Sequence, residues 1–229
     1  MGKTPLLGKA PRKHGTRVVV IGLGRFGGAL ARELVTHGSE VLAIDSNPAL
    51  VQEYSDDLTH VACADTTNME ALQQLGVPSF PHAVVSIGSN MEASILTTSL
   101  LADCNIPKIW AKATSRQHGQ ILERVGAHHV VLPEHDMGER VAHLVTGRMI
   151  DYIEFDADYA MAKTTAPRNA IGKSLTSSGL RQHFDITVVA IKHPGTEFTY
   201  ATADTVVGEG DQLIVSGRIE EVERFAELT

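Results

Sequence analysis

The stretch from Val18 to Asp45 reads VVVIGLGRFGGALARELVTHGSEVLAID. Its hexapeptide Gly22–Gly27 has the spacing G-x-G-x-x-G, directly after an apolar run and at the start of a helical pattern. The first glycine permits a tight turn, the second lets the backbone approach phosphate, and the third lets the helix pack on the strand. The amides at the start of the helix would face an anion. The stretch therefore predicts a nucleotide-binding βαβ unit.

Two charged residues bear on which nucleotide this unit binds. Asp45 ends the second predicted strand, where a carboxylate accepts hydrogen bonds from ribose hydroxyls and repels a 2′-phosphate. Arg25 lies inside the glycine loop. A cation there adds charge-assisted hydrogen bonds to phosphate oxygens, which suits ATP or ADP better than a bridging pyrophosphate. The alternative is that Arg25 points to solvent, and the residues alone leave both interpretations open.

Composition narrows the class of protein. The chain has 229 residues, is 43% hydrophobic and carries a net charge of -7. This length suits one α/β domain with a smaller second domain. The acidic balance argues against nucleic acid as the main partner, because a phosphate-binding surface needs clustered Lys and Arg. Cys63 and Cys104 have neither disulfide-like nor zinc-like spacing, and no apolar run reaches the roughly 18 residues of a membrane span.

Apolar strand-like runs alternate with helical patterns as far as residue 133. Helix starts are predicted at Asn47, at a capping box of Thr67 with Glu70, at Asn90 and at Ser115. Six strands separated by five helices predict a Rossmann-like parallel six-stranded sheet with helices on both faces. The predicted strands are 18–21, 41–44, 60–63, 83–87, 108–111 and 129–132.

The residues before and after the predicted sheet domain, 17–134, do not continue its alternation of strands and helices. Residues 1–16 are expected to be a flexible lead. A helix predicted over 134–150 carries an apolar stripe. We interpret it as a connector with a hinge within 135–151. We expect its stripe to pack between subunits as well. Residues 152–229 predict a small α+β domain of the order β-α-β-β-α.

The chain lacks an evident catalytic constellation. His128, His129 and His135 gather around the last predicted strand, either as a metal site or, as we favour, as solvated or structural side chains. His193 lies in a turn with no acidic partner near it in the sequence. We therefore expect a binding protein rather than an enzyme, because a dehydrogenase would need proton-transfer groups and a substrate domain.

Residues 17–229 as a whole resemble the KtrA-type subunits of potassium uptake systems, members of the RCK (regulator of potassium conductance) superfamily. The resemblance is carried by GLGRFG, SIGSNMEASILTTSLLA, IPKIWAKA, ILERVGAHHVVLPEHDMGERVA and AIKHPG. It implies a domain that binds ATP or ADP and a C-terminal RCK domain. It also implies homodimers that assemble into an octameric ring. The ring would dock on the cytoplasmic face of an integral KtrB-like potassium-translocating subunit and gate it.

The resemblance also assigns residues to sites. Arg25 would reach the γ-phosphate bound in the neighbouring subunit, and Asp45 would bind the ribose. Glu134 would hold Mg or Ca together with ATP. Arg168 and Arg181 match arginines of a cyclic di-AMP site in some relatives, although Gly179 replaces a common asparagine there. The implied nucleotide contacts are Gly22, Leu23, Gly24, Arg25, Phe26, Gly27, Asp45, Ser46, Asp65, Thr66, Gly88 and Lys112.

Three functions therefore stand side by side. The first is an ATP- and ADP-sensing regulatory ring for a potassium transporter. The second is an NAD(H)-binding regulator of the related Trk type, which Asp45 permits and Arg25 disfavours. The third is a small NAD-dependent oxidoreductase, which the missing catalytic groups disfavour.

Overall fold

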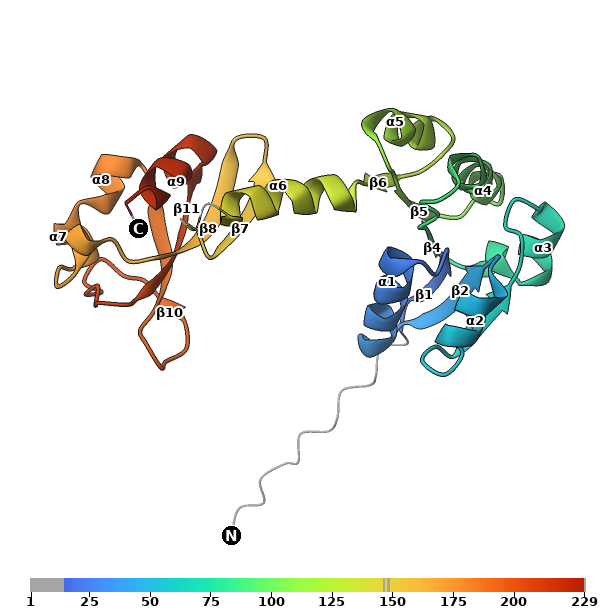
Figure 1. Cartoon of the computed structure of the whole chain (residues 1–229), viewed down its shortest axis with the longest axis horizontal. Helices are drawn as coiled ribbons and strands as arrows, with labels where there is room; N and C mark the ends of the chain where they lie inside the picture. Colours follow the sequence, from blue (N-terminus) through green and yellow to red (C-terminus); the bar gives the residue numbers. More distant parts are fainter. Residues whose placement is uncertain (1–14, 146, 148, 229) are drawn as a thin grey trace, which may run out of the picture. The chain divides into compact units, whose positions relative to one another are not determined.

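The chain divides into two compact units, Met1–Pro133 and Glu134–Thr229 (Figure 1). The computed structural model describes residues 15–145, 147 and 149–228. The predicted lead over residues 1–16 falls outside this range except for Gly15 and Thr16. Within the described residues, no helix is long and apolar enough to cross a membrane.

The first unit is built on a six-stranded parallel sheet, which confirms the predicted fold class. Its strand order is β3-β2-β1-β4-β5-β6, so the chain reverses its direction of winding between β1 and β4. The elements are β1 (Arg17–Ile21), α1 (Arg25–Thr36), β2 (Glu40–Asp45), α2 (Pro48–Tyr54), β3 (His60–Cys63), α3 (Met69–Gln74), the 3₁₀ turn η1 (Val77–Ser79), β4 (His82–Val85), α4 (Met91–Asp103), β5 (Lys108–Lys112), α5 (Arg116–Arg124) and β6 (His129–Val131).

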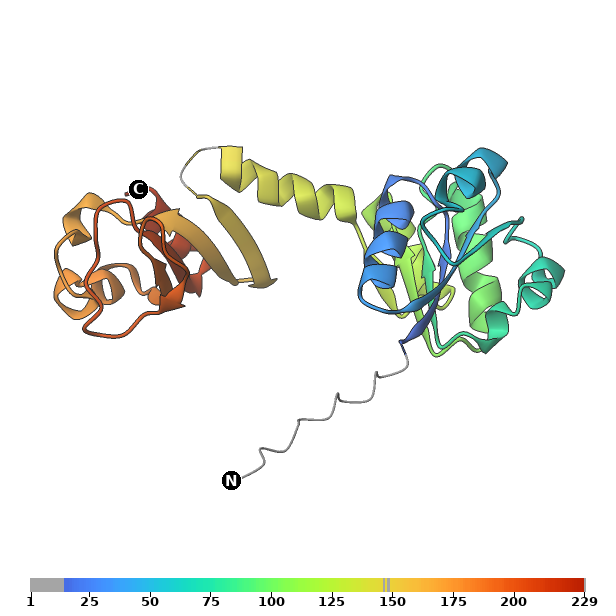
Figure 2. The same cartoon turned by 90° about the horizontal axis from the view of Figure 1, so that it is seen from below.

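Strand β1 is apolar from Val18 to Ile21 because the sheet is covered on both faces. Val18 and Val20 pack into one hydrophobic cluster with residues of α1 and α2. Val19 and Ile21 point the other way, into a cluster that includes residues of α3, α4 and α5. Figure 2 shows α1 and the green α4 on opposite sides of the sheet. A strand buried on both faces reads as a continuous apolar run rather than an alternating one.

The predicted helix starts hold with one exception. The side chains of Asn47, Asn90 and Ser115 each accept a hydrogen bond from a first-turn amide of the following helix. The predicted capping box at Thr67 is wrong, because the N-cap of α3 is Asn68, whose side chain accepts from the Glu70 amide. The Thr67 hydroxyl instead donates to Asp65.

The second unit contains a five-stranded sheet of order β10-β9-β11-β8-β7 with antiparallel pairing throughout. Its first β-segment is a hairpin of two strands rather than the single strand of the predicted order. The elements are α6 (Pro133–Val145), β7 (Asp151–Asp156), β8 (Tyr159–Thr165), the 3₁₀ turn η2 (Arg168–Ala170), α7 (Leu175–Ser178), α8 (Leu180–Phe184), β9 (Thr187–Lys192), β10 (Thr199–Tyr200), β11 (Gln212–Arg218) and α9 (Ile219–Ala226).

Helix α6 is shorter than the predicted 134–150. It ends at Val145, and Gly147 adopts a left-handed φ of +73° that favours glycine. Met149, which the sequence pattern assigns to the helical stripe, instead belongs to the buried core of this unit. The Ile150 amide already pairs with the Lys163 carbonyl of β8, so the chain is entering the sheet at that point.

Candidate functional site

The glycine loop lies between β1 and α1, and its geometry explains two of its glycines. Gly22 has a left-handed φ of +96° and donates its amide to the Ile44 carbonyl at 2.7 Å. A Cβ placed on Gly27 would lie 1.9 Å from the Gly22 carbonyl oxygen. A Cβ on Gly24 would meet nothing within 4 Å. Gly24 is thus unhindered by the protein itself, as expected if its role is to leave space for a ligand.

Ser86 holds the glycine loop in place through hydrogen bonds to backbone carbonyls. It was not among the residues predicted from the sequence. Its buried hydroxyl lies 2.9 Å from the Ile21 carbonyl oxygen and 2.5 Å from that of Gly22. It belongs to the segment predicted as strand 83–87, but β4 ends at Val85 and the serine side chain turns toward the loop. The available signal was a polar residue at the carboxyl end of an otherwise apolar strand, the place where ligands bind in such sheets.

Asp45 is bonded to the loop that it was predicted to assist. One carboxylate oxygen accepts the Leu23 amide at 2.6 Å, and the other accepts the Asn47 amide at 2.8 Å. The carboxylate therefore fixes the loop and the start of α2 together. Each oxygen retains a further lone pair for a ribose hydroxyl. Ser46 follows it and is exposed, with its carbonyl 3.7 Å from the Cys63 thiol.

Three predicted residues from separate segments converge beside the loop. The Lys112 ammonium lies 5.8 Å from the centre of the Phe26 ring. A Cβ on Gly88 would lie 3.4 Å from the same nitrogen. Lys112 is only 9% exposed, which is unusual for a lysine and keeps its charge at the carboxyl end of β5. The structure thus brings together Phe26, Gly88 and Lys112, three of the residues that the family resemblance assigns to the nucleotide.

Asp65 and Thr66 follow β3 but differ in accessibility. Asp65 is exposed, and hydrogen bonds from the Thr67 hydroxyl and amide lower the pKa of its carboxyl. The Thr66 hydroxyl is buried and lies 2.9 Å from the Thr97 hydroxyl of α4. Asp65 is therefore open to a ligand, whereas the Thr66 side chain is engaged in packing against α4.

Together these residues lie at the carboxyl end of the parallel sheet, the place where such folds bind ligands. Helix α1 begins at Arg25, its N-cap is Gly24, and no side chain among the residues described caps it. Its first-turn amides and the exposed Arg25 side chain would face phosphates, while Asp45 lies at the end of the neighbouring strand. The site can bind and orient a nucleotide.

The remaining predicted residues lie in the second unit. Glu134 is in the first turn of α6 and is exposed, as are Arg168 in η2 and Arg181 in α8. Gly179 separates α7 from α8 with a left-handed φ of +69°. Asparagine is one of the few other residues that adopt this conformation readily.

The histidines singled out in the sequence have structural contacts. His128 accepts the Ile109 amide, and the His129 ring stacks on Trp110. His193 lies 2.7 Å from Asp211, a buried carboxylate that also accepts the Gly208 amide, so it has an acidic partner from a later turn. Across the described part of the chain, no three His, Cys, Asp or Glu side chains are grouped as metal ligands.

Comparison with known proteins agrees with this architecture. Residues 18–133 match the TrkA-N domain and residues 161–229 match the TrkA-C domain. The chain is 37% identical over 207 residues to the Ktr system potassium uptake protein A of Bacillus subtilis, covering 90% of this chain and 93% of that protein. It is 31% identical over 199 residues to the protein of the same name from Vibrio alginolyticus, covering 86% and 90%.

Among solved structures, the GsuK RCK domain superposes over 100% of this chain and 50% of its own, with a TM-score of 0.63 and 17% sequence identity. That likeness concerns the fold.

Proposed function

Because this chain belongs to the family of KtrA-type RCK subunits of Ktr potassium uptake systems, we propose that it is a nucleotide-sensing regulator of potassium transport. In this proposal the protein binds ATP and ADP, forms homodimers that assemble into an octameric cytosolic ring, and gates an integral KtrB-like subunit. It would lie in the cytoplasm, peripheral to the inner face of the cell membrane. ATP and ADP must then favour different conformations, since a ligand shifts an equilibrium only through unequal affinity.

The observation that supports nucleotide sensing best is the glycine loop with Arg25 at the start of α1. The side chain is exposed, immediately next to Gly24, where space is open for phosphates. Arg25 would distinguish a terminal phosphate by charge-assisted hydrogen bonds. Asp45 would hold the ribose, and Lys112 would add positive charge at the end of β5.

Assembly has support from the surface of α6. Met137, Val141 and Val145 recur every fourth residue along the helix and are 53%, 43% and 78% exposed. Apolar side chains in such a stripe are typical of a helix that packs against a partner. We propose that a second copy of this chain covers the stripe in the dimer.

We further propose that the protein is not an enzyme. The nucleotide would act as a signal, because the groups gathered at the loop bind and orient it without an evident acid, base or nucleophile for chemistry. The runner-up is an NAD(H)-binding regulator of the Trk type, favoured by the carboxylate of Asp45 at the ribose position. A small NAD-dependent oxidoreductase is the less favoured third candidate.

A thermal-shift titration with ATP, ADP, NAD and NADH separates these functions. ATP and ADP are expected to raise the melting temperature, since ligand at 100 times its Kd adds roughly 2.7 kcal/mol to stability. We expect Arg25→Ala to weaken ATP binding about tenfold or more and ADP binding little, as measured by calorimetry. Arg32→Ala, on the far part of α1, is the matched control. Equal losses for ATP and ADP would show that Arg25 does not recognise the terminal phosphate. Stabilisation by NADH alone would favour the Trk-type regulator.

A divalent cation, Mg or Ca, is proposed to accompany ATP through Glu134. A hard cation prefers carboxylate oxygens beside phosphates. Glu134→Gln is therefore expected to abolish the enhancement of ATP binding by magnesium or calcium while leaving metal-free ADP binding unchanged. Calorimetric titration of ATP with and without each metal measures this. Enhancement that persists in the variant would remove Glu134 from the metal site.

Cyclic di-AMP binding in the second unit is a further part of the proposal, with Arg168 and Arg181 as its anchors. Both are exposed arginines on short helices of the same unit. Arginine pairs well with phosphate because its planar donors match phosphate oxygens.

A further inference from the structure

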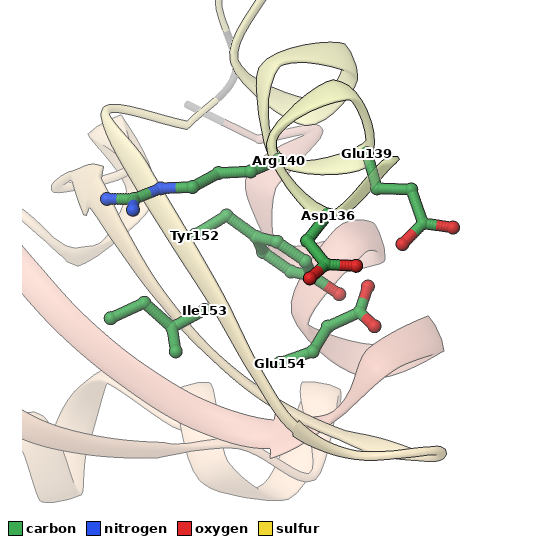
Figure 3. Close-up of a pocket in the computed structure, with 6 residues that line it drawn as sticks. All are labelled: Asp136, Glu139, Arg140, Tyr152, Ile153 and Glu154. Carbon is green, nitrogen blue, oxygen red and sulfur yellow. The ribbon is translucent and has the colours of Figure 1, made fainter. Parts of the chain in front are cut away.

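A titratable side chain is buried beside the candidate nucleotide site, in the first turn of α5. His118 is 1% exposed, and the site described above does not use it. The second unit offers a contrast, because its cavity of about 340 Å³ between α6 and β7 is lined by Asp136, Glu139 and Glu154 (Figure 3). Those three carboxylates are exposed, so solvent can satisfy them. A buried imidazole must find its partners within the fold, so the contacts of His118 indicate its role.

The contacts of the His118 imidazole fix its tautomer. The Thr114 amide donates to Nδ1 at 3.2 Å, and the Thr114 hydroxyl lies 3.3 Å from the same nitrogen. Nε2 is buried and makes no hydrogen bond with any residue that the structure describes. An amide can donate only to an imidazole nitrogen that carries no proton, so the neutral ring has its hydrogen on Nε2. The Ser115 hydroxyl accepts the His118 amide at 3.1 Å, so the backbone of His118 is held as well.

Burial favours the neutral form of this imidazole. Desolvation lowers the pKa of His118, and burial alone accounts for the shift. A second proton would turn Nδ1 into a donor and so break its hydrogen bond with the Thr114 amide. The titratable groups on α5 and on the elements that pack against it are Glu92 and Asp103 of α4, Lys108 and Lys112 of β5, Arg116, Glu123 and Arg124 of α5, and His129 of β6.

Thr114 lies in the β5–α5 loop, residues 113–115, which joins the nucleotide site to α5. It comes two residues after Lys112, whose ammonium lies 5.8 Å from the centre of the Phe26 ring. A Cβ on Gly88 would lie 3.4 Å from that ammonium and 4.0 Å from the Thr114 methyl group. Through Thr114, His118 is therefore connected to the side chains that gather beside the glycine loop.

We propose that His118 is a positioning residue for the nucleotide site, because its neutral imidazole binds the Thr114 amide and holds the β5–α5 loop with Lys112 beside Gly88. The inference rests on the proposed nucleotide function and names a residue on which that function depends. His118 does not touch the nucleotide. It acts through the loop, which keeps the Lys112 ammonium at the carboxyl end of the sheet.

Acid is expected to weaken nucleotide binding through this imidazole. Only the neutral form holds the loop, so affinity falls by up to roughly tenfold for each pH unit below the lowered pKa of His118. Stability changes in the same direction, because the unfolded chain, whose histidine pKa is about 6.5, binds more protons than the folded chain between the two pKa values. The contribution of His118 to stability is therefore complete above about pH 6.5 and declines as the pH falls toward the folded-state pKa.

The test compares His118→Asn with His118→Leu in the full-length protein. The asparagine oxygen can take the place of Nδ1 and accept the Thr114 amide, whereas leucine offers no acceptor. At about pH 8 we expect ADP affinity, measured by calorimetry, to fall roughly tenfold in His118→Leu and to stay within about threefold of wild type in His118→Asn. Between about pH 8 and about pH 5.5 the wild type should lose several-fold more affinity than His118→Asn, which shares the titration of the ADP phosphates but lacks the imidazole.

Amide hydrogen exchange without nucleotide tests the loop contact itself. Mass spectrometry of peptides that span residues 112–118 should show faster exchange in His118→Leu than in wild type, and wild-type exchange in His118→Asn. His60→Asn, at an exposed histidine that begins β3, is the control and should change neither exchange nor affinity.

Wild-type exchange or wild-type ADP affinity in His118→Leu would overturn the inference. The same pH dependence of affinity in wild type and His118→Asn would overturn it too, as would a loss of stability in both variants with affinity unchanged. If the wild type bound no nucleotide while the exchange pattern appeared as expected, the proposed function would fail and His118 would remain the group that holds the loop.

Discussion

Gly27→Ala is expected to destabilise the protein by about 1–3 kcal/mol or more and to abolish nucleotide binding, because the added methyl group has no space. A Cβ on Gly27 would lie 1.9 Å from the Gly22 carbonyl oxygen and 2.2 Å from the Ser86 hydroxyl. The first contact is with backbone, which cannot move aside as a flexible side chain does. The turn that presents the loop amides would therefore be displaced together with the start of α1.

Gly24→Ala is the matched variant within the same motif. It should fold with near wild-type stability, since a Cβ there meets nothing within 4 Å. We nevertheless expect ATP and ADP binding to weaken at least tenfold, because the methyl group would occupy the space left for phosphates. Urea denaturation and calorimetric titration of both variants measure the two effects separately. Normal stability and binding in Gly27→Ala, or undiminished binding in Gly24→Ala, would contradict the assigned roles.

Asp45→Ala is expected to produce the second largest loss. The substitution removes the acceptor of the Leu23 and Asn47 amides and the expected partner of the ribose. Hydrogen bonds to a charged group contribute about 1.5–3 kcal/mol each, and the half-buried position of Asp45 places the loss near the lower end. We expect a stability loss of roughly 1–3 kcal/mol and binding of every adenine nucleotide weakened more than tenfold.

Asp45→Asn refines this test because it keeps one carbonyl oxygen as an acceptor. It should lose less stability than the alanine variant while still losing most of the nucleotide affinity. Asp56→Asn, an exposed carboxylate after α2, serves as the control for removing a charge. Urea midpoints and calorimetry report the two quantities. If Asp45→Ala bound nucleotide with wild-type affinity, the carboxylate would stabilise the loop but would not contact the nucleotide.

The first unit could be predicted closely because local patterns and tertiary packing agree there. The runs that become β1 and β2 are apolar on both faces, and helices α2 and α4 begin at side chains that cap them locally, Asn47 and Asn90. The spacing of the glycines in the loop directly indicates where the backbone turns or needs space. Where two local cues compete, prediction failed. Asn68 rather than Thr67 caps α3, because Thr67 is engaged with Asp65.

The second unit was predicted less closely because its boundaries depend on partners distant in sequence. The apolar pattern continues past Val145, but Gly147 allows a left-handed turn and Ile150 finds its hydrogen bond on β8. Met149 then packs into the core of the unit instead of extending the helical stripe. Residues of a helix and a strand that share a face only after folding cannot be recognised by periodicity within either segment.

The sequence by itself determined the parallel sheet and the position of the glycine loop at its end, while the candidate contacts after β4 and β5 came from the family resemblance. The sheet and the loop could be predicted because strand burial, helix capping and glycine conformation depend on residues that are neighbours in the sequence. The tertiary structure alone decided that Ser86 supports the loop, that Asp45 is bonded to it, and that Lys112 lies beside Phe26. These contacts join residues from separate elements, and the packing of the sheet and helices brings them together.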